Sequence, residues 1–131
     1  MTSTAIVIVD DEKTILDSLK GQLRTMFGRR FRYETAEDAG EAWEVIEELL
    51  ENGVGVVVVV SDWLMPGKRG DEFLAELRAR HPTIGRILLT GQADADALQR
   101  AREDAKVCVV LHKPWSAEVL QRAIESALPT T

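Results

Sequence analysis

The sequence has a single cysteine, Cys108, among its 131 residues. One cysteine excludes an internal disulfide, and its place in the apolar run VCVVL indicates a small core residue, which fits a reducing compartment. No apolar run is long enough to cross a membrane, and the first residues, MTSTAIVIVDD, lack the basic region of a signal peptide. We therefore expect a cytoplasmic protein with no membrane partner.

Positive charge is also scarce, since 16 Lys and Arg stand against 22 Asp and Glu and give a net charge of −6. A general nucleic-acid binder carries a basic face, so we expect no direct nucleic-acid partner. The acidic pair Glu47-Glu48 is interpreted as a solvated helix face. Linkers, repeats and low-complexity segments are absent, and the length is that of one domain. The sequence predicts a single domain over residues 1–131.

Four short apolar runs are rich in Val and Ile and do not alternate with polar residues, which is typical of parallel strands covered on both faces. These runs are Ala5–Val9, Val56–Val60, Ile84–Leu89 and Val107–Leu111. A fifth segment, Phe31–Thr35, alternates apolar and charged residues and is expected at an edge of the sheet.

Apolar residues at helical spacing follow each of these strands. The stripes lie at 15–26, 42–49, 73–77, 97–101 and 119–128. A Thr35-x-x-Asp38 pattern and Ser116 are expected to cap two of the helices, and Gly28 is expected to end the first. Five strand–helix units predict an α/β fold: a five-stranded parallel sheet in the order 2-1-3-4-5 with helices on both faces, the flavodoxin-like doubly wound arrangement.

Polar residues stand at the ends of four of the strands, and the carboxyl ends of parallel strands meet at one rim of the sheet. The first strand ends in Asp10-Asp11, Asp62 follows the third, the fourth ends in Leu89-Thr90-Gly91, and the fifth ends in Leu111-His112-Lys113-Pro114. Three carboxylates close together repel one another unless a cation such as Mg²⁺ joins them. An ammonium and a hydroxyl group beside them can neutralise the oxygens of a phosphoryl group. Asp62 would then be the nucleophile that forms an acyl phosphate.

The segments IVDDE (8–12), SDWLMPGKRG (61–70), LLTG (88–91) and HKPW (112–115) resemble the response-regulator receiver domains of two-component signalling, over nearly the whole chain. The resemblance implies a phosphoacceptor signalling domain. Asp62 would receive a phosphoryl group from a sensor histidine kinase or a phosphotransfer protein. The chain would catalyse only its own phosphorylation and dephosphorylation, and would not otherwise be an enzyme.

The resemblance also implies the roles of the residues around Asp62. Mg²⁺ would be bound by Asp62 and Asp11 directly, by Asp10 through water, and by the backbone carbonyl of Leu64. The phosphoryl oxygens would be held by Thr90 and Lys113, while Gly91 would keep the approach open. The peptide bond before Pro114 is expected to be cis.

Two positions depart from the family pattern. Val110 stands where an aromatic residue usually precedes the lysine by three positions, and Leu64 stands where a polar residue is common. We expect phosphorylation to move the Thr90–Ala93 loop and the start of the fourth helix, while Val110 keeps one rotamer. The surface of the fourth helix, fifth strand and fifth helix would then change. An effector domain, a downstream protein or a second copy of the chain remains open as its partner.

Two alternatives remain beside the receiver hypothesis. A haloacid-dehalogenase-like phosphatase also uses an aspartate after an apolar strand, but it needs a second aspartate where this chain has Leu64. An interaction module that works without phosphorylation would not need the complete set of acidic, hydroxyl and ammonium groups. A flavin-binding version of the fold is disfavoured because Asp10-Asp11-Glu12 would repel a phosphate.

Overall fold

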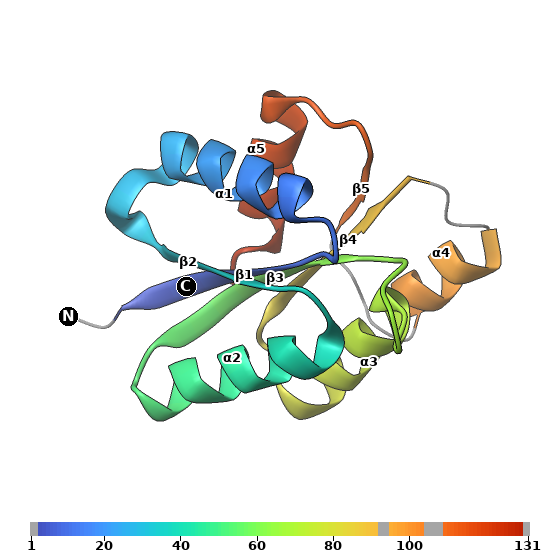
Figure 1. Ribbon diagram of the computed structural model, residues 1–131, viewed down its shortest axis with the longest axis horizontal. Helices are drawn as coiled ribbons and strands as arrows, with labels where there is room; N and C mark the ends of the chain where they lie inside the picture. The colour runs from blue at the N-terminus through green and yellow to red at the C-terminus, as the bar shows by residue number, and fades with distance from the viewer. Residues whose placement is uncertain (1–2, 92–94, 104–108, 130–131) are drawn as a thin grey trace.

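The computed structural model describes residues 3–91, 95–103 and 109–129, and its five strands form one parallel sheet (Figure 1). The strand order is β2-β1-β3-β4-β5, which confirms the predicted fold and places the alternating segment at an edge. The expected strand residues Val107 and Cys108 lie outside the described residues. The strands are β1 Thr4–Val9, β2 Arg32–Ala36, β3 Gly55–Asp62, β4 Gly85–Thr90 and β5 Val109–His112.

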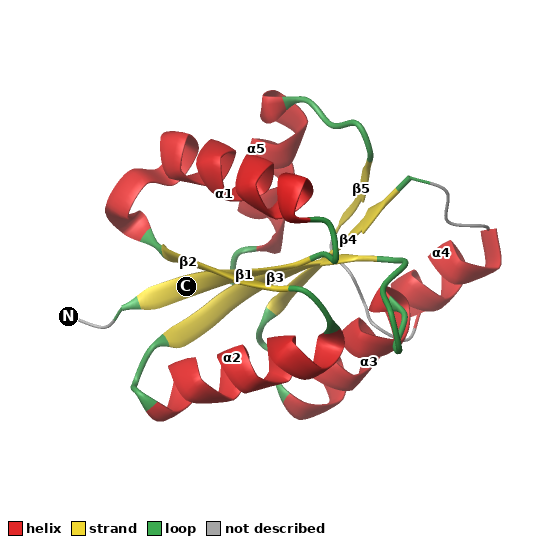
Figure 2. Ribbon diagram, in the orientation of Figure 1, coloured by secondary structure: helices red, strands yellow, loops and turns green. Residues whose placement is uncertain are grey.

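A helix follows each strand, and the helices cover both faces of the sheet (Figure 2). One face is covered by α1 and α5, whose leucines pack on the alternate residues Ile6 and Ile8 of β1. The other face is covered by α2 and α3, with α4 beside α3, and there Val7 and Val9 of the same strand meet Phe73. The central strands are therefore buried on both sides, as their unbroken apolar runs predict. The helices are α1 Lys13–Phe27, α2 Ala39–Glu51, α3 Gly70–Arg80, α4 Ala95–Glu103 and α5 Ala117–Ala127, with a short 3₁₀ helix at Gly28–Arg30.

Several element ends follow the expected local signals. Ser116 is the N-cap of α5, and its Oγ accepts a hydrogen bond from the Val119 N–H at 3.2 Å. Gly28 ends α1 with a φ of 56°, a conformation that favours glycine. Among the described helices, none is long and apolar enough to cross a membrane.

Two expectations about element ends were wrong. Asp62 does not follow β3 but is its last residue, because the parallel pairing with β4 continues to Asp62 opposite Leu89. Thr35 does not cap α2, because it is paired with Ile8 inside β2. The cap is Asp38, whose Oδ1 accepts a hydrogen bond from the Glu41 N–H at 2.8 Å.

Candidate functional site

An open depression lies at the carboxyl ends of β1, β3, β4 and β5, where the sequence predicted the site. Its volume is about 470 Å³. The doubly wound topology explains this position, because the connections from β1 and β3 leave the sheet toward opposite faces and open a crevice between them. The residues that line it are Asp11, Glu12, Asp62, Trp63, Leu64, Thr90, Gly91 and Lys113.

Three aspartates meet at this rim, with one carboxylate oxygen of each within 4.8 Å of the others. Asp10 is completely buried, Asp62 is 6% exposed and Asp11 is exposed. The backbone N–H of Asp10 donates to the carbonyl of Ala36 at 3.0 Å, which fixes the end of β1 beside β2. The carboxylate of Asp10 accepts a hydrogen bond from the Glu12 N–H at 2.8 Å. The turn after β1 therefore holds one acid inside the protein and leaves Asp11 facing solvent.

Lys113 connects the acids at the carboxyl ends of β1 and β3. Its Nζ lies 3.2 Å from Asp10 Oδ2 and 3.2 Å from Asp62 Oδ1. The backbone N–H of Lys113 donates to the Thr90 carbonyl at 2.8 Å, so β4 positions the lysine at the rim. The peptide bond from Lys113 to Pro114 is cis. One ammonium group therefore partly neutralises two buried carboxylates.

The charges of this cluster shift one another's ionisation. Burial raises the pKa of Asp62 to about 6, and the negative charge of Asp10 adds to this effect while Lys113 opposes it. Burial also raises the pKa of Asp10, against the opposing effects of the Glu12 N–H and Lys113. Burial alone would lower the pKa of Lys113, but the two carboxylates together raise it. The lysine is therefore charged, and the acids carry more negative charge than it can balance.

The donor set fits a divalent cation. Carboxylate oxygens are the hard ligands that Mg²⁺ prefers, and Mg²⁺ commonly uses one or two of them and keeps several waters. Asp11 is exposed and Asp62 lines the depression, so an ion can reach both from solvent. A second positive charge would relieve the repulsion that Lys113 leaves uncompensated.

The other predicted site residues lie around this cluster. Thr90 is buried at the end of β4, next to Gly91 in the lining of the depression. Leu64 is 56% exposed at the mouth of the depression. Val110 is half-buried on β5 and packs against the core beneath α2 and α3.

Sequence reasoning missed Gly70, the first residue of α3. A Cβ atom at this position would lie 1.9 Å from the carbonyl oxygen of Asp62, and the Gly70 N–H donates to the Trp63 carbonyl at 2.8 Å. The loop after β3 thus folds back onto the backbone of Asp62. The only signal in the sequence was the glycine itself, because the approach joins residues eight positions apart through an irregular loop.

The raised pKa of Asp62 predicts a stability that falls with rising pH in the metal-free protein. The unfolded carboxyl titrates near its ordinary value of 3.8 and the folded one near 6, so the folded state binds the extra proton between these values. We expect Asp62→Asn to raise the free energy of unfolding by up to about 3 kcal/mol at pH 7.5. This gain should vanish below about pH 4, where both states are protonated.

Urea unfolding in EDTA at pH 4 and pH 7.5 measures this difference. Asp17→Asn, which makes the same change at an exposed position of α1, is the control and should have little effect. Equal stability of wild type and Asp62→Asn at pH 7.5 would contradict the proposed crowding of charge.

Comparisons with known proteins agree with this geometry. Residues 6–125 match the family described as the response regulator receiver domain. A chemotaxis protein CheY homolog of Campylobacter jejuni is 29% identical over 95% of this chain and 92% of its own length. The hydrogenase transcriptional regulatory protein HoxA of Cupriavidus necator is 33% identical over 94% of this chain. The chain spans 24% of the length of that regulator and 13% of a sensor kinase CckA from Brucella abortus.

Solved structures show the same similarity in three dimensions. A response regulator receiver domain protein from Clostridium thermocellum has a TM-score of 0.79 and 32% identity, over 95% of this chain and 93% of the other. The signal receiver domain of an HD domain-containing protein from Pseudomonas fluorescens has a TM-score of 0.85 and 27% identity, over 98% of this chain and 88% of the other. Because the family match covers most of the chain and the strand order agrees, this protein belongs to the response regulator receiver domain family.

Proposed function

We propose that Asp62 is the residue through which this receiver domain accepts a phosphoryl group, donated by the phosphohistidine of a sensor kinase or a phosphotransfer protein. One observation supports this choice above the others: Lys113 Nζ lies 3.2 Å from a carboxylate that also lines an open depression. Asp10 is completely buried, so a donor cannot reach it, and Asp11 is exposed and has no ion pair among the described residues. Asp62 alone combines access with a fixed positive charge.

The transfer needs little more from the protein than placement. An oxygen of the Asp62 carboxylate forms a bond to phosphorus as the bond from phosphorus to the imidazole nitrogen breaks, and the imidazole leaves. Lys113 and the Thr90 hydroxyl would then donate to the oxygens of the phosphoryl group. Gly91 has no side chain to narrow the rim. The domain would catalyse this transfer to itself and the later hydrolysis, and residues 1–131 would act as one receiver unit.

We assign a Mg²⁺ site to the same acids. Asp11 and Asp62 would bind the ion directly, Asp10 through water, and the Leu64 backbone carbonyl would add a further ligand. When bound, the ion would neutralise charge that develops on the phosphoryl oxygens. Leu64 cannot donate a proton, which argues against the haloacid-dehalogenase-like phosphatase.

The proposed output is a change in the surface formed by α4, β5 and α5. Val110 is half-buried on β5 and has a branched side chain with no ring to rotate, so movement would be concentrated near Thr90 and the start of α4. Residues 92 and 93 of the Thr90–Ala93 loop that was expected to move lie outside the described residues. An effector domain, a downstream protein or a second copy could read this change. A structure described as the beryllofluoride-activated NtrC4 receiver domain dimer, 28% identical with a TM-score of 0.81, is consistent with the last of these.

Intact mass spectrometry tests the proposal directly. Incubation with acetyl phosphate and Mg²⁺ should add one phosphoryl group per chain, because the small donor replaces the phosphohistidine. EDTA should prevent the reaction, and restoring Mg²⁺ in excess should restore it. A chain that stays unmodified with Mg²⁺ and with an active phosphohistidine donor would exclude the phosphoacceptor function.

A further inference from the structure

Charge is strongly separated along one stretch of the chain. Residues 20–32 contain five basic side chains and no acidic one, and residues 34–51 contain eight acidic side chains and no basic one. The basic group is Lys20, Arg24, Arg29, Arg30 and Arg32, and the acidic group is Glu34, Glu37, Asp38, Glu41, Glu44, Glu47, Glu48 and Glu51. In a protein with a net charge of −6, this basic cluster is a local exception.

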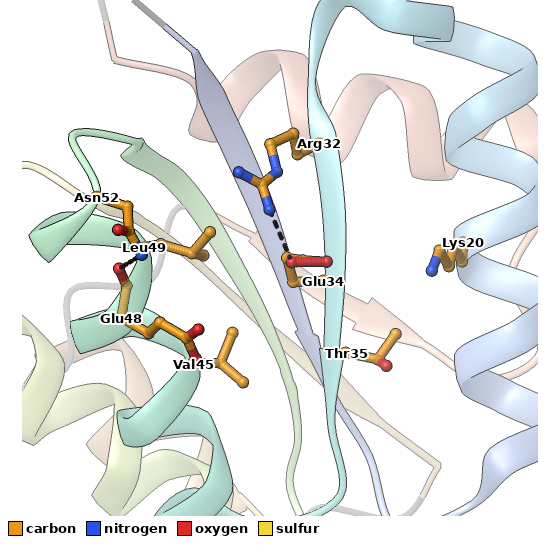
Figure 3. A pocket seen from close by; sticks show the side chains of 8 residues that line it. All are labelled: Lys20, Arg32, Glu34, Thr35, Val45, Glu48, Leu49 and Asn52. Atoms are coloured by element: carbon orange, nitrogen blue, oxygen red, sulfur yellow. Dashed lines mark hydrogen bonds and ion pairs between the residues drawn. The ribbon is translucent and has the colours of Figure 1, made fainter.

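The fold places the two groups on opposite sides of the edge strand β2. Lys20 and Arg24 lie on α1, and Arg29 and Arg30 lie on the 3₁₀ helix that follows it. Most of the acidic group lies on α2, which covers the other face of the sheet, while Arg32 and Glu34 lie on β2 itself. A cleft of about 200 Å³ runs along this edge between the two helices. Figure 3 shows Lys20 of α1 on one side of β2, and Glu48 of α2 with the following residue Asn52 at the other side.

Most of these charges have no opposite charge as a partner in the part of the chain that the structure describes. Within the described ranges, the ion pair formed among these two groups joins Arg32 to Glu34, at 3.5 Å. Lys20 and Arg24 on α1 form no ion pair among the described residues, and the glutamates of α2 form none either. Arg24 and Glu48 are exposed to solvent. The β2 edge therefore presents two adjacent, oppositely charged surfaces whose charges are not neutralised internally.

We propose that this β2 edge is an interface between two copies of the chain, in which the basic side of α1 faces the acidic side of α2 of the other copy. In a dimer whose two-fold axis is parallel to β2, the face that carries α1 in one copy continues into the face that carries α2 in the other. Each α1 then lies beside the α2 of the other copy, once on each face of the joined sheets. Each charge pair is then made in both directions, as a symmetric dimer requires. Complementary surfaces of this kind fix orientation and speed association.

The positions of the charged residues along α1 and α2 agree with this arrangement. Both helices run back from the carboxyl rim of the sheet. Arg24 and Glu48 each stand three residues before the end of their helix, α1 for Arg24 and α2 for Glu48. A two-fold axis perpendicular to the sheet would instead place α1 beside α1 and α2 beside α2. Like charges would then meet on both faces, which disfavours the continuous antiparallel sheet that an exposed edge strand can form.

This interface is separate from the proposed signalling surface. Because β2 and β5 are the two opposite edges of the sheet, a dimer through β2 leaves α4, β5 and α5 free. The dimer therefore does not depend on the phosphoacceptor function of Asp62. Dimerisation should be the same in Asp62→Asn as in wild type.

Sedimentation velocity over a range of protein concentrations tests the interface. We expect a dimer in about 0.05 M salt whose dissociation constant rises at least about tenfold in about 0.5 M salt, because screening weakens exposed charge pairs. A chain that is monomeric at every concentration in low salt would overturn the proposal. A dimer that salt does not weaken would overturn it too, since its contacts would not be these charges.

Charge reversal then locates the contact. Glu48→Lys and Arg24→Glu should each weaken the dimer by about tenfold or more, because each change acts twice in a symmetric interface. The double variant should recover most of the affinity, because the pair is restored with reversed signs. Glu125→Lys and Arg102→Glu make the same charge changes at exposed positions on α5 and α4 and are the controls. Equal effects of test and control variants, or a double variant weaker than both single ones, would overturn the assigned pairing.

Discussion

Asp62→Asn is expected to abolish phosphorylation by acetyl phosphate and by a phosphohistidine donor, while the protein stays folded. The amide has nearly the shape of the carboxylate but lacks its nucleophilic charge. The substitution also removes one of three negative charges whose carboxylate oxygens lie within 4.8 Å of one another, so electrostatic repulsion inside the metal-free site decreases. Loss of the adduct with unchanged or increased stability would therefore separate the chemical role of Asp62 from a structural one.

Intact mass after incubation with Mg²⁺ and acetyl phosphate is the measurement, and Asp17→Asn is the matched control. The control lies on the exposed side of α1 and should be phosphorylated like wild type. A wild-type adduct that peptide mapping places on Asp10 or Asp11 would show that Asp62 is the wrong nucleophile. A stoichiometric adduct on Asp62→Asn would have the same meaning.

The sequence predicted the fold because its signals are local and repeated. The unbroken run from Val56 to Val60 is short and β-branched, which favours a strand covered on both faces, and the helical stripes between such runs left few topologies. The alternation in Phe31–Thr35 was enough to place β2 at the edge of the sheet. The rim residues followed from the topology, because parallel strands bring their carboxyl ends together whatever the loops do.

What the sequence could not predict depends on contacts between distant residues. The end of β3 was placed too early, because the pairing of Asp62 with Leu89 on β4 extends the strand beyond its apolar run. The cap of α2 was assigned to Thr35, because a local pattern does not show that β1 keeps this residue in a strand. The link from Lys113 to both Asp10 and Asp62 needs three strands in register, and no spacing in the sequence indicates which oxygens it contacts.

Gly70→Ala is expected to lower the free energy of unfolding by about 3 kcal/mol and to impair phosphorylation of the molecules that remain folded. The added Cβ would lie 1.9 Å from the Asp62 carbonyl oxygen and 2.8 Å from its carbonyl carbon, so either α3 or the end of β3 must move. These two atoms belong to the backbone of Asp62 in β3, and a backbone carbonyl in a strand cannot rotate away as a side chain could. A displacement near 1 Å at a reacting group can slow a reaction by about a hundredfold.

Two other glycines separate these effects. Gly85→Ala places a Cβ 2.0 Å from the Ala127 carbonyl, at the start of β4 and away from the rim, so it should destabilise the protein but leave phosphorylation of folded molecules unchanged. Gly21→Ala adds a methyl group in open space on α1 and should stabilise the protein by roughly 0.5–1 kcal/mol. Urea unfolding and phosphorylation rates, measured for all three variants, test the assignment. If Gly70→Ala and Gly85→Ala lose stability and phosphorylation in the same proportion, the close approach at Gly70 only supports the fold. If only Gly70→Ala slows phosphorylation of folded protein, this glycine positions the backbone of the phosphoacceptor.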